Sequence, residues 1–305
     1  MRIARAAWLA PLVALACGCS GEPVTRSNGV KVVATIQPLA SLARELVGAD
    51  GSVRCLLPPG ASPHTFEPLP RDVAELDGAA LVIGIGAGLD DWSTRLLAGV
   101  GSPPRVITML ALPGTKPLDW ASDDERSEHA SLDPHAWLDP IRVRDALVPE
   151  LTRALSEIDP QNADRYRERG AALAAALTDL DASLRQTLAG IEARGFISYH
   201  DSWRYFAERY RLDQVASIET YAGDEPTAAE LGNLVRIARS RGVHAVIMEP
   251  QLGQRVARNI ATELGARIEM ADPLGDPTDP ARATYVGAMR FNAAAFARAL
   301  GGVAP

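Results

Sequence analysis

Three histidines and one aspartate stand where apolar runs of the sequence give way to loops. His64 lies in GASPHTFEP, His135 in LDPHAWLDP, His200 in ISYHDSWRYF and Asp272 in ADPLGD. The chain has only five histidines, so three of them in such settings form a concentrated signal. Imidazole nitrogens with one carboxylate favour a tetrahedral Zn²⁺ site over Ca²⁺ or Mg²⁺ sites, which are built from oxygen ligands. These residues predict binding of a transition metal.

Each of these positions also has an ordinary structural interpretation. His64 follows a proline-rich turn, where a lone histidine is more often a capping or surface residue, and His135 lies between two Asp-Pro turns, as a buried hydrogen-bonded histidine would. His200 and Asp272 follow apolar runs, at the carboxyl edge where open α/β sheets bind ligands. Asp-Pro is also a common turn signal. The prediction depends on the coincidence of the four positions.

The elements that must position these residues alternate between short apolar runs and helical patterns. Strands are expected at residues 31–36, 52–57, 81–86 and 105–110 in the first half, and at 196–199, 214–217, 245–248 and 267–270 in the second. Such alternation predicts parallel sheets covered by helices on both faces. We expect an α/β fold with two lobes, each built on one parallel sheet.

A segment without strand signals separates the two halves. It runs from about residue 140 to 194, and its apolar residues recur at helical spacing after Asp159-Pro160. A helix of some thirty residues would span about 45 Å, enough to run along both lobes. The expected domains are an N-terminal lobe at 30–158, a long rigid linking helix at 159–194 and a C-terminal lobe at 195–305.

The N-terminus has the pattern of an export signal. Two arginines precede an apolar stretch at residues 6–16, which is too short to span a bilayer because spanning takes about twenty residues. Residues 1–18 are predicted to be removed, and Cys19 in ACGCSG resembles the lipidated first residue of a bacterial lipoprotein. Ala16 departs from that pattern, in which leucine is commoner. Only Cys55 then remains, so no internal disulfide is expected.

The charge of the chain argues against nucleic acid as a partner. The sequence carries 31 Lys and Arg against 38 Asp and Glu, a net charge of −7, and an acidic chain has no electrostatic attraction for nucleic acid or anionic lipid. An acidic loop at 113–133 holds His129 and is either a solvated surface loop or a flap over the site. His129 and His244 are expected to lie outside the metal site.

The motifs, in this order and spacing, resemble those of the lipoproteins and periplasmic proteins that supply zinc or manganese to ABC importers. The resemblance covers nearly all of the mature chain. It rests on PHTFEP around His64, DPHAWLDP around His135, YHDSWRYF around His200, DEPTAAEL at 224–231, MEPQ at 248–251 and ADPLGD around Asp272. It implies two α/β lobes joined by a long helix, with the metal held in the cleft between them by His64, His135, His200 and Asp272.

The resemblance also implies a biological role. The chain would be an extracytoplasmic solute-binding protein, in the periplasm or anchored by lipid to the outer face of the cytoplasmic membrane. It would bind as a monomer to an ABC transporter permease with its ATPase, and it would not be an enzyme. Two family features are missing, because residues 113–133 hold a single histidine and the second lobe has no cysteine for a disulfide.

The choice of metal depends on His200. Relatives that take manganese tend to have a carboxylate at this position, which makes a harder site. Three imidazoles and one carboxylate favour Zn²⁺, with Mn²⁺ as the alternative. Imidazole must be neutral to bind a metal, and its reference pKa is about 6.5, so the affinity should fall below about pH 6.

Other classes of function remain open at this point. A secreted zinc hydrolase would keep an open coordination position for water, and its common HExxH motif is absent from the sequence. A surface adhesin lipoprotein could use the same scaffold. A two-lobed protein that binds haem, cobalamin or a siderophore would need a roomy aromatic cleft, and only 5% of this chain is aromatic.

Overall fold

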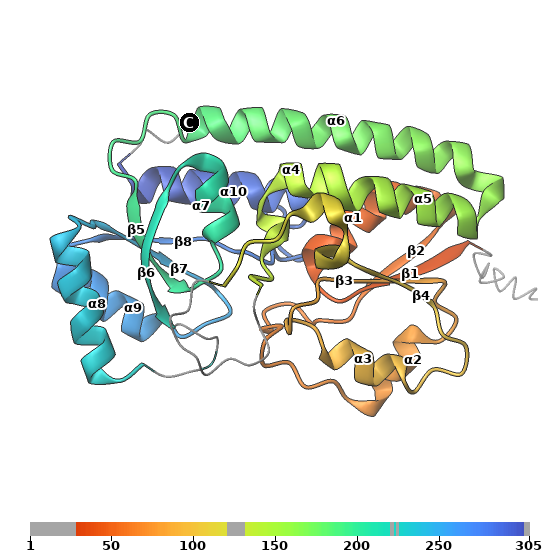
Figure 1. Cartoon of the computed structure of the whole chain (residues 1–305), viewed down its shortest axis with the longest axis horizontal. Coiled ribbons are helices and arrows are strands. Elements are labelled where there is room, and N and C mark those ends of the chain that lie inside the picture. Colours follow the sequence, from red (N-terminus) through yellow and green to blue (C-terminus); the bar gives the residue numbers. More distant parts are fainter. Residues whose placement is uncertain (1–28, 121–131, 220–222, 224–225, 302–305) are drawn as a thin grey trace, which may run out of the picture.

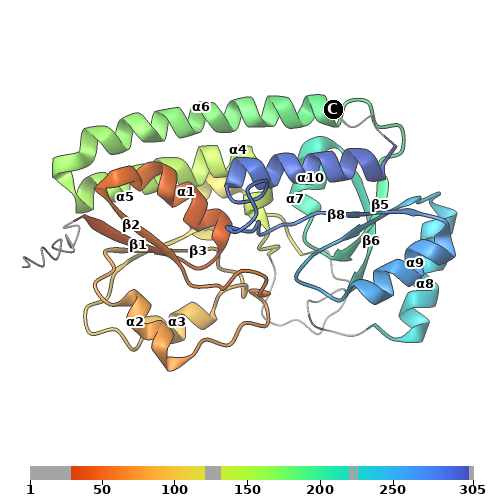
Figure 2. The same ribbon diagram turned by 180° about the vertical axis from the view of Figure 1, so that it is seen from behind.

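The computed structural model describes residues 29–120, 132–219, 223 and 226–301. Two α/β lobes lie side by side, and one long helix runs over both (Figures 1 and 2). The expected signal at 1–18, Cys19 and His129 lie outside the described residues, as do residues 121–131 of the acidic loop. The two-lobed α/β fold expected from the sequence is confirmed.

The first lobe is built on a four-stranded parallel sheet with the strand order β2-β1-β3-β4. Its strands are β1 (Val30–Ala34), β2 (Gly51–Cys55), β3 (Leu81–Gly84) and β4 (Arg105–Thr108). One face carries α1 (Gln37–Val47), and the other carries α2 (Val73–Leu76) and α3 (Trp92–Leu97) (Figure 1). Helix α1 has Pro38 in its first turn, where the N–H that proline lacks would have no partner within the helix.

The second lobe repeats the plan with the order β6-β5-β7-β8, again all parallel. Its strands are β5 (Gly195–His200), β6 (Asp213–Glu219), β7 (Ala245–Met248) and β8 (Arg267–Met270). Its helices are α7 (Arg204–Tyr210), α8 (Ala228–Ser240), α9 (Gln254–Leu264) and α10 (Tyr285–Ala299). Helix α8 begins with a capping box in which Thr227 and Glu230 pair reciprocally, so the part of DEPTAAEL from Thr227 to Glu230 is a helix-start signal.

Between the lobes the chain is helical. It runs through α4 (Pro140–Arg142), a π-helical turn (Val143–Leu147), α5 (Val148–Ile158) and α6 (Ala163–Thr187). Helix α6 has 25 residues and is therefore about 37 Å long, and it covers parts of both lobes (Figure 2). The remaining short helical turns are Gly48–Asp50, Pro70–Asp72, Met109–Ala111, Pro113–Thr115, Ala136–Leu138 and Pro160–Asn162.

One apolar core extends through both lobes beneath α6. It joins buried residues of β1, β3 and α1 to buried residues of β5, α7 and α10. At its centre the Phe296 ring packs against Phe196, Trp203 and Phe206, with ring centroids 5.0 to 5.1 Å apart. Two smaller clusters fill the outer layers of the molecule, one in each lobe.

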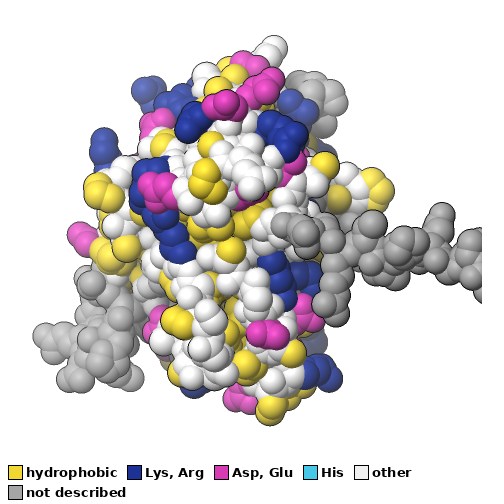
Figure 3. Space-filling model, turned by 90° about the vertical axis from the view of Figure 1, so that its right-hand side faces the viewer, with side chains coloured by type: hydrophobic (Ala, Val, Ile, Leu, Met, Phe, Trp, Pro, Cys, Tyr) yellow, Lys and Arg dark blue, Asp and Glu magenta, His cyan; other side chains and the backbone are white. Residues whose placement is uncertain are grey.

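The surface at the end of the first lobe is of mixed charge. Acidic and basic side chains alternate over the end of the first lobe, with apolar patches between them (Figure 3). No helix within the described ranges is long and apolar enough to cross a membrane.

Candidate metal centre

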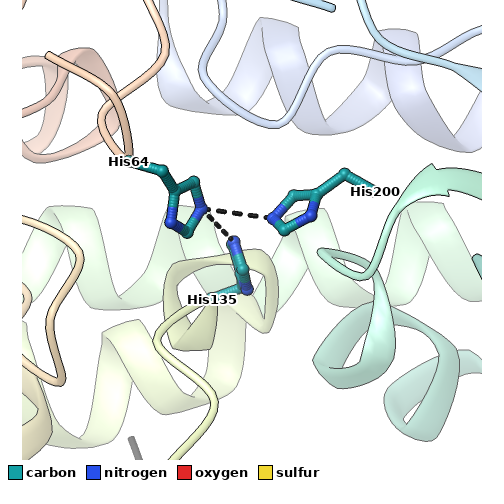
Figure 4. Close-up of side chains that lie close together, drawn as sticks. All are labelled: His64, His135 and His200. Carbon is teal, nitrogen blue, oxygen red and sulfur yellow. Dashed lines mark hydrogen bonds between the residues drawn. The ribbon is translucent and has the colours of Figure 1, made fainter. Parts of the chain in front are cut away.

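Three histidines meet where the two lobes face each other (Figure 4). Nε2 of His64 lies 3.3 Å from Nε2 of His135 and 3.2 Å from Nε2 of His200. One ring nitrogen from each residue lies within 4.8 Å of the other two. His64 follows β2, His135 precedes the turn Ala136–Leu138, and His200 ends β5, so three distant segments supply the group.

The loop that presents His64 is anchored to α3. The indole Nε1 of Trp92 donates a hydrogen bond to the carbonyl of Pro63 at 3.1 Å. The same indole packs edge-on against Phe66, with 4.8 Å between the ring centroids. Contacts on both sides of His64 therefore fix the turn that carries it, and prolines before it stiffen the chain further.

Asp133 fixes the orientation of the His135 ring. Its Oδ1 lies 2.8 Å from Nδ1 of His135 and accepts a hydrogen bond from the His135 backbone N–H at 2.9 Å. Both side chains are buried. A carboxylate on Nδ1 leaves Nε2 free for a metal and makes it a stronger ligand. The sequence motif indicated only a turn at Asp133-Pro134, although the spacing of two residues between Asp133 and His135 is the signal for this pairing.

His200 lies at the carboxyl edge of the second sheet, and its neighbours connect it to β7. The carboxyl of Glu249, just after β7, accepts hydrogen bonds from Ser202 Oγ at 2.7 Å and from Trp203 Nε1 at 3.2 Å. Burial raises the pKa of Glu249 to about 8. Glu249 belongs to the MEPQ motif, and its place just after a strand, like those of His200 and Asp272, was the signal that could have found it.

Burial keeps two of the imidazoles neutral. It lowers the pKa of His64 to about 3, and the neighbouring His135 lowers it in the same direction. Burial also holds the pKa of His200 well below its usual value, with further lowering by His135 and His64. Neutral imidazole is the form that binds a metal ion. The structure thus keeps these two imidazoles in the neutral form over a wide range of pH.

Asp272 lies at the carboxyl edge of β8, outside the histidine group. Its Oδ1 accepts hydrogen bonds from Gln251 Nε2 at 2.8 Å and from the backbone N–H groups of Leu274 and Gly275 at 3.1 and 3.0 Å. Its Oδ2 pairs with Nη1 of Arg282 at 2.5 Å. The structure brings the three predicted histidines together and places the predicted aspartate in an ion pair. Its role as a fourth ligand stays a prediction.

A small cavity adjoins the histidines. Its walls come from both lobes and include Pro63, Trp137, Ser202, Glu249, Gln251 and Pro273. Trp137, from the first lobe, is hydrogen-bonded to two residues of the second lobe. Its Nε1 donates to the carbonyl of Pro273 at 2.8 Å, and its carbonyl accepts from the hydroxyl of Tyr285 at 2.7 Å. Three imidazoles in this setting are ligands suited to a borderline-soft divalent cation. His244 is exposed and precedes β7, outside the histidine group.

Comparisons with known proteins agree with this geometry. The sequence model of the family described as "Zinc-uptake complex component A periplasmic", ZnuA, matches residues 32–299. The chain is 29% identical over 276 residues to the high-affinity zinc uptake system protein ZnuA of Bacillus subtilis, an alignment that covers 86% of this chain and 85% of that protein.

A second relative and a solved structure extend the comparison. The chain is 26% identical to the zinc-binding lipoprotein AdcA of Streptococcus pneumoniae over 93% of its own length, and it spans 58% of that longer protein. A crystal structure of a ZnuA deletion mutant with zinc bound superimposes with a TM-score of 0.78 at 32% identity, covering 91% of this chain and all of the other.

Proposed function

The chain belongs to the ZnuA family of periplasmic zinc-uptake components, which are zinc-binding substrate-binding proteins of ABC importers, and we propose that it captures Zn²⁺ between its lobes and delivers it to a permease. The observation that carries the proposal is the convergence of three histidine nitrogens from separate segments within 4.8 Å of one another. The ion is the cargo of the protein and is held for release.

The proposed ligands are His64, His135, His200 and Asp272. The three imidazoles supply nitrogen donors, and the carboxylate would complete a tetrahedral Zn²⁺ site. A histidine at position 200, where a carboxylate would make a harder site, favours zinc over manganese. His64 and His135 come from the first lobe, whereas His200 and Asp272 come from the second, so the ion would cross-link the lobes.

The proposed setting is extracytoplasmic. Export by the N-terminal signal and lipidation at Cys19 would hold the protein, as a monomer, at the outer face of the cytoplasmic membrane near a permease and its ATPase. AdcA, one of its relatives, is itself named a lipoprotein. Because the relatives are named for zinc uptake and zinc binding, we propose a binding role and no catalysis.

Competition between metals tests the proposal. Purified metal-free protein is exposed to equal concentrations of Zn²⁺ and Mn²⁺, washed and subjected to elemental analysis. We expect one zinc ion per chain and little manganese, because three imidazole ligands favour zinc. A protein loaded with manganese would contradict the choice of metal, and a protein with no bound metal would contradict the proposed function.

A further inference from the structure

The ion pair between Asp272 and Arg282 places a cation where a metal would compete for the same carboxylate. The two side chains are 1% and 17% exposed, and Nη1 of Arg282 lies 2.5 Å from Oδ2 of Asp272. A guanidinium at this distance stabilises the carboxylate in its present position. A cation that recruits Oδ2 of Asp272 would therefore compete with this contact.

Arg282 would keep other partners if Asp272 turned away. Its Nε donates to Oδ2 of Asp279 at 2.8 Å, Asp276 lies 3.7 Å from its Nη2, and its guanidinium lies 5.3 Å from the centre of the Phe291 ring. Arg282 is thus held in place independently of Asp272. Its positive charge would remain beside the site after a metal ion has bound.

The backbone around Asp272 is fixed as well. Asn292 pairs with both the N–H and the carbonyl of Asp272, at 2.7 and 2.8 Å. At the far end of the segment, the Gln37 amide donates to the carbonyl of Ala283 at 3.2 Å. Because the main chain is held on both sides, the carboxylate can exchange partners only by rotation of its own side chain.

We propose that Arg282 is a specificity-determining residue that competes with the bound metal for Asp272 and thereby favours zinc over manganese. This inference rests on the proposed function. Zinc would gain most of its binding free energy from the three imidazoles, so competition by Arg282 for the fourth ligand, Asp272, costs it less. Manganese prefers oxygen ligands and depends more on Asp272, so it is penalised more strongly by the competing guanidinium.

Affinity measurements on the full-length mature protein test this role. Dissociation constants for Zn²⁺ and for Mn²⁺ are measured with a competing chelator in the wild type, Arg282→Gln and Asp272→Asn. A neighbouring opposite charge weakens the binding of a cation such as a proton to a carboxylate by about tenfold or more. Arg282→Gln removes that charge and should therefore tighten Mn²⁺ binding by about tenfold. Zn²⁺ binding should tighten less, so the dissociation constant for Mn²⁺ divided by that for Zn²⁺ should become smaller.

The matched control is Arg298→Gln. Arg298 pairs with Glu269 of β8 at 2.9 Å on the surface, so this variant removes the same charge and one ion pair away from the site. It should leave both dissociation constants unchanged. Arg282→Lys keeps the charge, and its ratio of Zn²⁺ to Mn²⁺ affinity should lie nearer the wild type, which separates loss of charge from loss of folding.

A double variant decides whether Arg282 acts through Asp272. In the Asp272→Asn background, Arg282→Gln should have no further effect on the ratio. The inference is overturned if folded Arg282→Gln binds both metals like the wild type, binds them more weakly, or changes the ratio equally in the Asp272→Asn background. Failure of the wild type to bind zinc would instead overturn the proposed function.

Discussion

At the scale of single residues, burial changes how the site responds to pH. The reference pKa of imidazole predicted that metal affinity would fall below about pH 6. Burial lowers the pKa of both His64 and His200, so protonation of these two rings should weaken metal binding only below that pH, and the pH at which the affinity falls stays a prediction. Protons compete with the metal for these two rings only at lower pH. Keeping these rings neutral at low pH instead lowers the stability of the metal-free protein, because the unfolded chain can bind the protons.

Replacing His64 with Gln should remove part of that pH dependence. The pKa of His64 is about 3 in the folded chain and about 6.5 when unfolded. Between these values the unfolded state binds the extra proton, so folding stability rises with pH, by about 2 kcal/mol from pH 5 to 6.5. Urea unfolding of the metal-free proteins should show the wild type losing about 2 kcal/mol more than His64→Gln between pH 7 and 5. An equal loss in both would contradict the assignment.

The residues of the site differ in how far the sequence reveals them. His64, His135 and His200 could be identified because each histidine stands in a turn or at a strand end. Arg282 could not, because it lies ten residues beyond Asp272 in a polar loop, and only the folded loop brings its guanidinium to the carboxylate. Pairing across such a loop depends on backbone geometry that residue types do not encode.

At the scale of elements, the carboxyl ends of the strands in the second lobe gather ionisable groups. β5 ends at His200, Glu249 follows β7 directly, and Asp272 stands two residues after β8. Alternation of strands and helices could be predicted from the apolar runs. The strand ends were less predictable, since β3 ends at Gly84 and β4 at Thr108, each before the predicted limit. Apolar residues such as Ile85 and Met109 continue past the strands because they enter the core.

Glu249 offers a test at this scale. Its pKa is about 8 in the folded protein, against about 4.3 for a free glutamate. The unfolded state therefore ionises first, and stability falls as pH rises between these values, by about 3 kcal/mol from pH 5 to 7. Glu249→Gln cannot ionise and keeps an oxygen that can accept from Ser202 and Trp203.

The measurement is denaturant unfolding of the metal-free protein at pH 5 and pH 7. Glu249→Gln should gain about 3 kcal/mol relative to the wild type as the pH rises, in the direction opposite to the histidine effect. Glu263→Gln, at the exposed end of α9, is the control and should gain nothing. A Glu249 variant that behaved like this control would show that the buried carboxyl ionises normally.

At the scale of the whole molecule, the proposed ion joins two lobes that already share a core. A ligand that binds only the folded state adds RT ln(1 + [L]/Kd), about 4 kcal/mol at a thousandfold excess over Kd. His200→Ala removes a ligand from the second lobe and should abolish most of the zinc-dependent rise in melting temperature. His244→Ala, an exposed histidine outside the group, should keep it. Retention of the full shift by His200→Ala, with its loss in His244→Ala, would refute the site.

The overall division into two lobes was predictable from the strand-free segment between the halves. The expected helix at 159–194 corresponds to a turn at Pro160–Asn162 and to α6 at Ala163–Thr187, and the domain boundaries built on it stay a prediction. Continuity of the core across the lobes was not predictable. Periodicity shows which face of a helix is buried and does not show which lobe will cover it.

That continuous core has a consequence for how the molecule comes apart. The ring of Phe296, near the C-terminus, is packed against rings from the start of the second lobe, and the same cluster reaches β1. Cutting the chain between the lobes would leave these four rings together in the C-terminal fragment. It would expose, on both fragments, the buried residues through which the cluster joins β1, β3 and α1 to β5, α7 and α10, so neither half is a self-sufficient folding unit. The metal-free protein should therefore lose its structure in one cooperative step, and the lobes cannot be exchanged between relatives as independent modules.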